Sequence, residues 1–179
     1  MNLYKNVIKT VLNLARVALF ALALVSLVLV SCNNASEGEG SGKDPAPEFT
    51  VYDRSGDAVH LSDFVGKPVV LNFWATWCAY CIMEMPDFNN AYISYPDVAF
   101  LMVNATDGVN ETEDKAKNYV DSMGFGFDIY FDTDSSAQNA YRINAYPMTF
   151  FIDRDGSLVF SHRGKISYDA LIEGIESIR

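Results

Sequence analysis

The sequence is short of basic side chains and of histidine, and each shortage excludes a class of function. Of its 179 residues, 13 are Lys or Arg and 23 are Asp or Glu. So acidic a chain lacks the basic surface that nucleic-acid binding requires, and it gains nothing from anionic lipid headgroups. Its two histidines, His60 and His162, stand far apart in the sequence and form no metal-binding motif by themselves.

Long apolar runs are also missing, apart from one near the N-terminus. That run covers 17–30 and is interrupted only by Ser26. It is shorter than the roughly 20 residues that span a membrane, and it follows a basic start without acidic residues, as in a signal peptide. It ends at Leu29-Val30-Ser31-Cys32, which resembles the bacterial lipobox. We expect a signal peptide at 1–31 and a lipid on Cys32; an uncleaved anchor helix is the alternative.

A stretch dominated by Gly, Ser, acidic residues and Pro follows at 33–47. This composition is typical of a flexible tether, about 20 Å long as a random coil. Residues 1–31 hold three basic residues and no acidic one, so removing them leaves 10 basic against 23 acidic, a formal charge of −13. The expected organisation is a signal peptide at 1–31, a lipidated cysteine and tether at 32–47, and one folded domain at 48–179.

The sequence pattern predicts two strands first, then strands alternating with helices, and finally a hairpin and a helix. Expected strands are Phe49–Tyr52, Ala58–Leu61, Pro68–Trp74, Val98–Val103, Met148–Ile152 and Leu158–Ser161, with a strand or an extended linker at Phe127–Phe131. Expected helices are Ala79–Tyr92, Glu111–Met123 and a closing helix capped by Ser167, with helical turns at 62–64 and 135–141. The central strand–helix–strand unit predicts a parallel pair inside an α/β domain.

The segment with the clearest chemistry is Trp77-Cys78-Ala79-Tyr80-Cys81. A buried strand precedes it, and a helix is predicted to begin at the first cysteine. Free N–H groups at a helix start favour a thiolate, and lowering a cysteine pKa from about 8.5 to about 7 raises the thiolate fraction at pH 7 about fifteenfold. Cys81 lies one helical turn further in, so the spacing predicts an exposed attacking thiol and a protected resolving thiol.

Two structural readings compete with redox chemistry at these cysteines. The pair could be a staple, although so short a loop returns only about 2 kcal/mol, against about 4.7 for a 100-residue loop. It could also be half of a zinc site, but only His60 and His162 remain as further ligands of the zinc-preferring kind.

The segment Phe-Trp-Ala-Thr-Trp-Cys-x-x-Cys resembles the active site of the thioredoxin superfamily. Together with the lipobox, the N-terminal hairpin and Cys-x-x-Cys-x-x-Glu, it is similar to the TlpA/ResA-like branch over roughly residues 45–179. The resemblance implies a thioredoxin-like fold, a central mixed sheet flanked by helices with an N-terminal hairpin extension. It implies Cys78 as nucleophile, Cys81 as resolving cysteine and Pro86 as a helix kink. It implies substrate contacts from the cis-proline Pro147, its neighbour Tyr146, Gly164, and Trp77, Ala79 and Tyr80.

Glu84 follows Cys81 by three residues and lies near the same helix face. In the family the matching glutamate assists proton transfer, and a carboxylate here could take the proton of Cys81. The alternative is an ordinary solvated helix glutamate. We take the functional interpretation, with a Glu84→Gln change expected to alter exchange and to leave stability nearly unchanged.

The sequence departs from the family at four positions. Asn72 stands where thioredoxins often carry a buried aspartate, so a proton shuttle is not expected there. Tyr80 replaces the common proline before the second cysteine, which leaves the redox potential open. Tyr146 and Met148 flank Pro147 where smaller residues or Thr are usual, which leaves the substrate open.

The other apolar side chains are expected to be core, among them Phe150, Phe151 and Phe160. Met83 and Met85 are expected to pack in the interior, with an apolar docking surface as the alternative. The basic segment 162–165 is either a neighbour of the thiolate or a solvated strand end.

These observations predict a thiol–disulfide oxidoreductase that acts on protein substrates, with no bound cofactor beyond its redox-active disulfide. The resemblance implies a reductant in the bacterial cell envelope, held on a membrane by its lipid and facing the periplasm or the exterior. A membrane thiol-transfer protein would supply its electrons, and apocytochrome c thiols are one candidate target. The alternative function is copper or metal handling by Cys78, Cys81 and His162.

Overall fold

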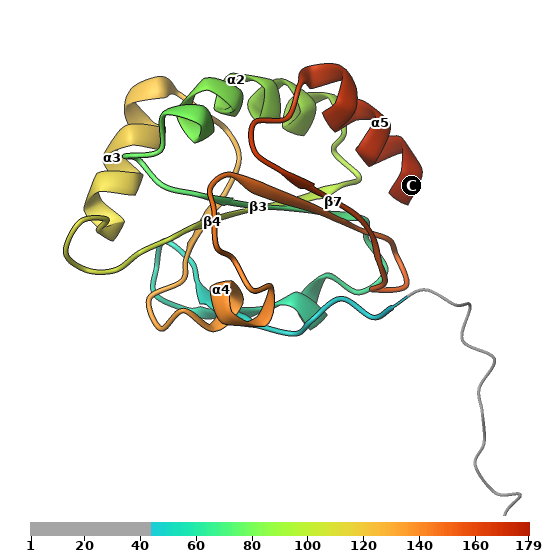
Figure 1. Cartoon of the computed structure of the whole chain (residues 1–179), viewed down its shortest axis with the longest axis horizontal. Coiled ribbons are helices and arrows are strands. Elements are labelled where there is room, and N and C mark those ends of the chain that lie inside the picture. Colours follow the sequence, from blue (N-terminus) through green and yellow to red (C-terminus); the bar gives the residue numbers. More distant parts are fainter. Residues whose placement is uncertain (1–43) are drawn as a thin grey trace, which may run out of the picture. The chain divides into compact units, whose positions relative to one another are not determined.

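The computed structural model in Figure 1 describes residues 44–179. The expected signal peptide, Cys32 and most of the expected tether lie outside the described residues. Within 44–179, the longest and most apolar helices still fall short of what a membrane crossing requires.

The described chain forms seven strands, four α-helices and one 3₁₀ helix in the predicted order. They are β1 (Thr50–Tyr52), β2 (Ala58–His60), η1 (Leu61–Phe64), β3 (Val69–Trp74), α2 (Ala79–Ser94), β4 (Ala99–Asn104), α3 (Glu113–Met123), β5 (Ile129–Phe131), α4 (Ser136–Ala140), β6 (Met148–Ile152), β7 (Leu158–Arg163) and α5 (Tyr168–Ile178). The segment that could have been a strand or a linker is the strand β5.

All seven strands join one mixed sheet in the order β2-β1-β5-β4-β3-β6-β7. β3, β4 and β5 run parallel, as the strand–helix–strand pattern predicts, and the hairpins β1–β2 and β6–β7 add antiparallel strands at the two edges. The thioredoxin-like fold with its N-terminal hairpin extension is thereby confirmed. β3 lies between β4 and β6, which places the segment that leads to the cysteines at the centre of the sheet.

Helices cover both faces of the sheet, with α2, α3 and α5 on one face and α4 on the other (Figure 1). Each face has its own core because strand residues alternate between them. Val70 and Trp74 of β3 pack under α2, whereas Leu71 and Phe73 pack on the α4 side. Every residue of β3 is buried, as its continuous apolar run predicts.

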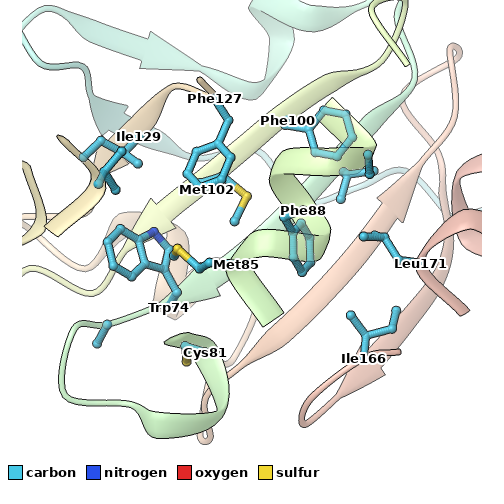
Figure 2. Packing of buried hydrophobic residues seen from close by; sticks show 14 of the residues in the cluster. Trp74, Cys81, Met85, Phe88, Phe100, Met102, Phe127, Ile129, Ile166 and Leu171 are labelled. Atoms are coloured by element: carbon cyan, nitrogen blue, oxygen red, sulfur yellow. The ribbon is translucent and has the colours of Figure 1, made fainter. Parts of the chain in front are cut away.

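The core beneath α2 reaches from the cysteine motif to the closing helix. Figure 2 shows Cys81, Met85 and Phe88 following one another along α2, with Trp74 of β3 beside them and Ile166 and Leu171 on the far side. The cysteine motif therefore rests on a packed core, which limits how far the start of α2 can shift.

Several local expectations need correction. α3 begins at Glu113, because Thr112 is its N-cap, so Glu111 lies in the preceding loop. Phe160 is 43% exposed because β7 is an edge strand, although its ring stacks on that of Phe151 at 5.3 Å. Ala46 N–H donates to Gly156 O, so the last residues of the expected tether are held against the β6–β7 turn.

Candidate active site

The two cysteines lie where the central strand β3 gives way to α2. Cys78 is the N-cap residue of α2, with extended backbone angles, and its Sγ accepts the N–H of Cys81 at 3.2 Å. The helix starts at Ala79, as predicted. The first N–H groups of a helix have no acceptor within the helix and favour negative charge on an atom that accepts them. The bond from Cys81 N–H therefore stabilises a thiolate at Cys78.

Cys78 and Cys81 form a disulfide with their Cα atoms 5.3 Å apart. Cys78 is 6% exposed and Cys81 is fully buried. The predicted order of accessibility is therefore present, but the expectation of an openly exposed Cys78 is wrong, because Cys78 is bonded to Cys81 and belongs to the packed core. An attacking group must approach within the small open part of Cys78.

Glu84 is a buried side chain, so its interpretation as a solvated helix glutamate is wrong. It is 1% exposed and lies on the inner face of α2. Its Oε1 accepts from Asn72 Nδ2 at 3.0 Å and its Oε2 accepts from Ile166 N at 2.9 Å. Asn72 Nδ2 also donates to Thr149 Oγ1 at 3.1 Å, which ties the carboxyl to the two central strands.

Burial raises the pKa of Glu84 from its ordinary value of 4.5 to about 7. Desolvation is the largest cause; the hydrogen bonds from Ile166 and Asn72 and the charge of Lys165 oppose it, and Asp87 adds slightly to it. A carboxyl group with a pKa of about 7 can both accept and release a proton near neutral pH. Lys165 belongs to the basic segment 162–165, which the structure thus brings within electrostatic reach of Glu84.

The residues on the opposite side of the motif come from the start of β6. The Tyr146–Pro147 peptide bond is cis, as the family resemblance implied. Pro147 is buried, and its carbonyl accepts the N–H of Gly164 at 2.9 Å. Gly164 has a φ of +89°, a conformation that side-chain-bearing residues rarely adopt. Pro147 and Gly164, 17 positions apart, therefore lie side by side.

Aromatic side chains connect the cysteine loop to the segment that holds Pro147. The rings of Trp77 and Tyr146 meet edge to face with their centroids 5.5 Å apart. Trp77 is 57% exposed, Tyr80 is 62% exposed and Ala79 is exposed beside them. Met83 is 59% exposed and Met85 is buried, so the packing expectation holds for Met85 and is wrong for Met83.

Sequence reasoning missed two buried acidic residues near the site. Glu111 accepts hydrogen bonds from the backbone and side chain of Thr76, two residues before Cys78. Asp132 accepts from Gln138, whose Oε1 in turn accepts the hydroxyl of Tyr146. Both residues follow strand ends in polar stretches of the sequence, where an acidic residue is ordinarily solvated, so nothing in the pattern distinguishes them.

No group of three or more His, Cys, Asp or Glu side chains is arranged to hold a metal ion between residues 44 and 179. The copper-binding alternative therefore has no third ligand of these types in that part of the chain. His162 instead lies 3.3 Å from the carbonyl of Lys165 through its Nε2.

A Cys-x-x-Cys disulfide at the start of a helix, on a thioredoxin-like sheet that also carries a cis-proline next to Tyr146, defines a class, the thiol–disulfide oxidoreductases of thioredoxin fold. Residues 43–161 match the AhpC/TSA family, and the chain belongs to that family. It is 35% identical over 137 residues to the thiol-disulfide oxidoreductase ResA of Bacillus thuringiensis subsp. konkukian, which covers 76% of this chain and 78% of that protein. It is 32% identical over 154 residues to ResA of Bacillus subtilis, covering 85% and 81%.

Solved structures agree with this placement. The thioredoxin Etrx1 of Streptococcus pneumoniae, described as an exposed lipoprotein, matches with a TM-score of 0.64 at 28% identity, covering 73% of this chain and 98% of its own. DsbF of Mycobacterium tuberculosis, solved in mixed oxidised and reduced forms, matches with a TM-score of 0.68 at 28% identity, covering 76% and 99%. The predicted activity is confirmed: the protein is a thiol–disulfide oxidoreductase.

Proposed function

We propose that this oxidoreductase reduces disulfides of protein substrates outside the cytoplasm, with Cys78 as attacking thiol, Cys81 as resolving thiol and Glu84 as proton carrier. The observation that carries the proposal is the asymmetry of the pair: Cys78 caps the helix and retains some exposure, while Cys81 is fully buried, one helical turn before the buried Glu84. No bound cofactor is needed, because the cysteine pair itself carries two electrons.

The reaction begins with the reduced pair. The Cys78 thiolate attacks one sulfur of a substrate disulfide, that bond breaks, and one substrate thiolate leaves. Cys81 then loses its proton and attacks the Cys78 sulfur, which breaks the mixed disulfide and releases the second substrate thiolate. The substrate gains two electrons, and the protein is left with the Cys78–Cys81 disulfide.

Glu84 is suited to the second step. Cys81 is a thiol without contact to solvent, so it needs a nearby acceptor for its proton. Glu84 follows it by one helical turn, and its pKa of about 7 makes it a good acceptor at neutral pH. In the reverse direction the protonated carboxyl returns the proton as Cys81 leaves.

Substrates are proposed to dock over the exposed apolar side chains of Trp77, Tyr80 and Met83. All three lie within five residues of Cys78, and large exposed apolar side chains gathered at one place mark interaction sites. Because Cys78 is only slightly exposed, we expect the substrate to present its disulfide on an extended segment that can reach Cys78. We propose proteins with apolar residues next to the target disulfide as the preferred substrates.

Trapping tests the assignment of the two thiols. A Cys81→Ser variant, reacted with a protein disulfide, should accumulate a mixed disulfide on Cys78, because the resolving thiol is missing. The reciprocal Cys78→Ser variant is the control and should react much more slowly through its buried thiol. Faster labelling of Cys81 than of Cys78 would show that the roles are reversed.

The reduction potential tests the direction. A reductant should have a potential near that of thioredoxin, about −270 mV, whereas an oxidant should lie near the value of about −120 mV for DsbA. The potential is measured by equilibrating the protein with glutathione or dithiothreitol buffers. The fluorescence of Trp74, buried beside the cysteines, and of the exposed Trp77 can report the redox state.

The proposed setting is the bacterial cell envelope, with a lipid on Cys32 as membrane anchor and a membrane thiol-transfer protein as electron donor. The lipobox-like sequence supports the anchor, and apocytochrome c thiols are a candidate target. Reduction by a membrane donor would explain why the reactive domain is carried on a tether.

A further inference from the structure

Glu111 is a buried carboxylate that takes no part in the proton transfer described above. It has no exposed surface and lies in the loop between β4 and α3. Its Oε1 accepts from Thr76 N at 2.9 Å and from Asn104 Nδ2 at 2.7 Å, and its Oε2 accepts from Thr76 Oγ1 at 2.6 Å. Three short hydrogen bonds to a buried charge are among the stronger polar contacts in a protein.

The loop that carries Glu111 is itself fixed. Oδ1 of Asp107 accepts the N–H groups of Val109, Asn110 and Glu111 at 2.7 to 2.9 Å. The carbonyl of Glu111 accepts the N–H groups of Asp107 and Gly108, both at 3.0 Å. The carboxylate of Glu111 is therefore presented from a closed loop and not from a free side chain on the surface.

The residues that Glu111 holds lead directly into the reactive segment. Thr76 and Trp77 form a turn between the end of β3 and the helix cap Cys78. The turn has one further fixed point, the hydrogen bond from Cys78 N to Ala75 O at 3.2 Å. Trp77 projects from this turn, and its ring meets Tyr146 next to Pro147.

We propose that Glu111 is a positioning residue of the exchange reaction, which holds the Thr76–Trp77 turn so that Trp77 forms one wall of the substrate cleft. It acts through Thr76 and does not touch the reacting sulfurs. The inference depends on thiol–disulfide exchange at Cys78 and is independent of the direction of electron flow.

Geometry and charge can be separated by two substitutions. In Glu111→Gln one oxygen remains for Thr76 N and Asn104 Nδ2, and the hydroxyl of Thr76 can turn to accept from the new amide, so the turn stays in place without the negative charge. In Glu111→Ala all three hydrogen bonds are lost and the turn is released. Asp153→Ala is the matched control, because Asp153 is also a buried carboxylate that accepts backbone N–H groups, at the opposite end of β6.

The test uses the full chain with Cys81→Ser as the parent, so that only the first step is followed. Mixed-disulfide formation with a protein disulfide is compared with alkylation by iodoacetamide from pH 5 to 9. Glu111→Ala should slow mixed-disulfide formation about tenfold to a hundredfold, the range that misplacement by about an ångström produces. The pH midpoint of alkylation should stay within about 0.3 units, because the helix cap of Cys78 is untouched.

Glu111→Gln and Asp153→Ala test whether the position or the charge of the Glu111 side chain is responsible. Glu111→Gln should restore mixed-disulfide formation to within about threefold of the parent, and Asp153→Ala, compared where both proteins are folded, should remain within about twofold. Parental rates in folded Glu111→Ala would overturn the proposal, as would an equal loss in Asp153→Ala. A shifted alkylation midpoint in Glu111→Gln would also overturn it, since charge and not position would then be acting.

A milder variant covers the case in which Glu111→Ala does not fold. Thr76→Val removes the hydroxyl bond to Glu111 and leaves the backbone bond. It should slow mixed-disulfide formation by about threefold or more without moving the alkylation midpoint. An unchanged rate in folded Thr76→Val together with a slowed Glu111→Gln would likewise contradict a positional role. A failure of the exchange function itself is seen separately, as a parent that forms no mixed disulfide at all.

Discussion

Two opposing effects act on the carboxyl group of Glu84, namely desolvation and hydrogen bonding. It is desolvated enough to bind a proton near neutral pH, yet it accepts two hydrogen bonds that suit its ionised form. One donor, Asn72, belongs to the central strand, and the other, Ile166, belongs to the loop before α5. Its protonation is therefore linked to the fold as well as to the reaction.

Stability should reflect this link. The pKa of Glu84 is about 7 in the folded protein, against its ordinary value of 4.5 in an unfolded chain. The folded protein binds this proton more tightly than the unfolded chain, so the favourable contribution is complete below pH 4.5 and is lost as the pH rises through about 7. The difference corresponds to a loss of stability of up to about 3 kcal/mol across that window. Denaturant unfolding between pH 4 and 8 measures it.

Glu84→Gln should remove this component because glutamine is neutral throughout. The expectation of nearly unchanged stability assumed an exposed side chain and needs correction, because Glu84 is buried. The variant should be more stable than the parent above pH 7 and close to it near pH 4.5, and its exchange should slow about 10²-fold or more in the step that needs the proton acceptor. The Gln side chain keeps the shape of Glu84. The control is Asp87→Asn, because Asp87 is a nearby carboxylate that is only partly buried. An unchanged exchange profile would leave Glu84 with a structural role only.

At this scale the cysteine pair could be predicted from its spacing, and Glu84 from its place one helical turn after Cys81. Pro147 and Gly164 were implied only by the resemblance to the thioredoxin superfamily. The burial of Glu84 could not be predicted, since a helix glutamate is ordinarily exposed and only the packing of α2 against β3 and α5 decides otherwise. Glu111 was missed because its partner Thr76 lies 35 positions away, in the turn before α2. Asp132 was missed although its partner Gln138 lies only 6 positions away in α4, because an acidic residue after a strand end is ordinarily solvated.

At the level of elements, α5 packs on the sheet through a very close approach. A Cβ atom added at Gly174 would lie 2.4 Å from the ring of Phe151. Phe151 is fully buried in β6, and its ring is also stacked on that of Phe160, so the ring has little room to move. Glycine is needed here for contact distance, since its backbone is ordinary helix.

Gly174→Ala should therefore destabilise the protein although alanine is the better helix former. Overpacking costs about 1–3 kcal/mol, which meets or exceeds the gain of about 1 kcal/mol in helix propensity. Glu173→Ala on the exposed side of the same helix should stay within about 0.5 kcal/mol of the parent. Thermal or urea unfolding of both variants measures the difference. A more stable Gly174→Ala would mean that α5 can shift away from β6 at little cost.

The elements were predicted well in kind and order and less well at their ends. The continuous apolar runs identified β3, β4 and β6, and the cap Ser167 fixed the start of α5. Glu111 was assigned to α3 because acidic residues favour a first turn, but Thr112 competes for the cap and its side chain accepts from Lys115 N at 3.3 Å. The exposure of Phe160 depended on which strand forms the edge of the sheet, and no local pattern contains that information.

For the whole molecule, the net negative charge opposes binding to an anionic membrane. Without residues 1–31 the chain would carry a formal charge of −13. Polybasic segments attract anionic membranes by about 1 kcal/mol per basic residue, and this chain has the opposite balance. A protein so charged is repelled from an anionic bilayer, so stable attachment would have to come from the lipid proposed on Cys32.

Membrane extraction of the native protein should then yield a mature N-terminus at Cys32 bearing a diacylglyceryl group, identified by mass spectrometry. Residues 33–179, produced without the leader and without Cys32, should not sediment with vesicles of anionic or neutral lipid, because the acyl chain and the apolar leader are both absent and the net charge is negative. Their rate of exchange with a soluble protein disulfide should equal that of the lipidated form, since the tether carries none of the reactive groups. Vesicle binding by residues 33–179 would show that attachment does not need the lipid. An intact Met1 on the mature protein would contradict the lipid anchor and favour the uncleaved helix.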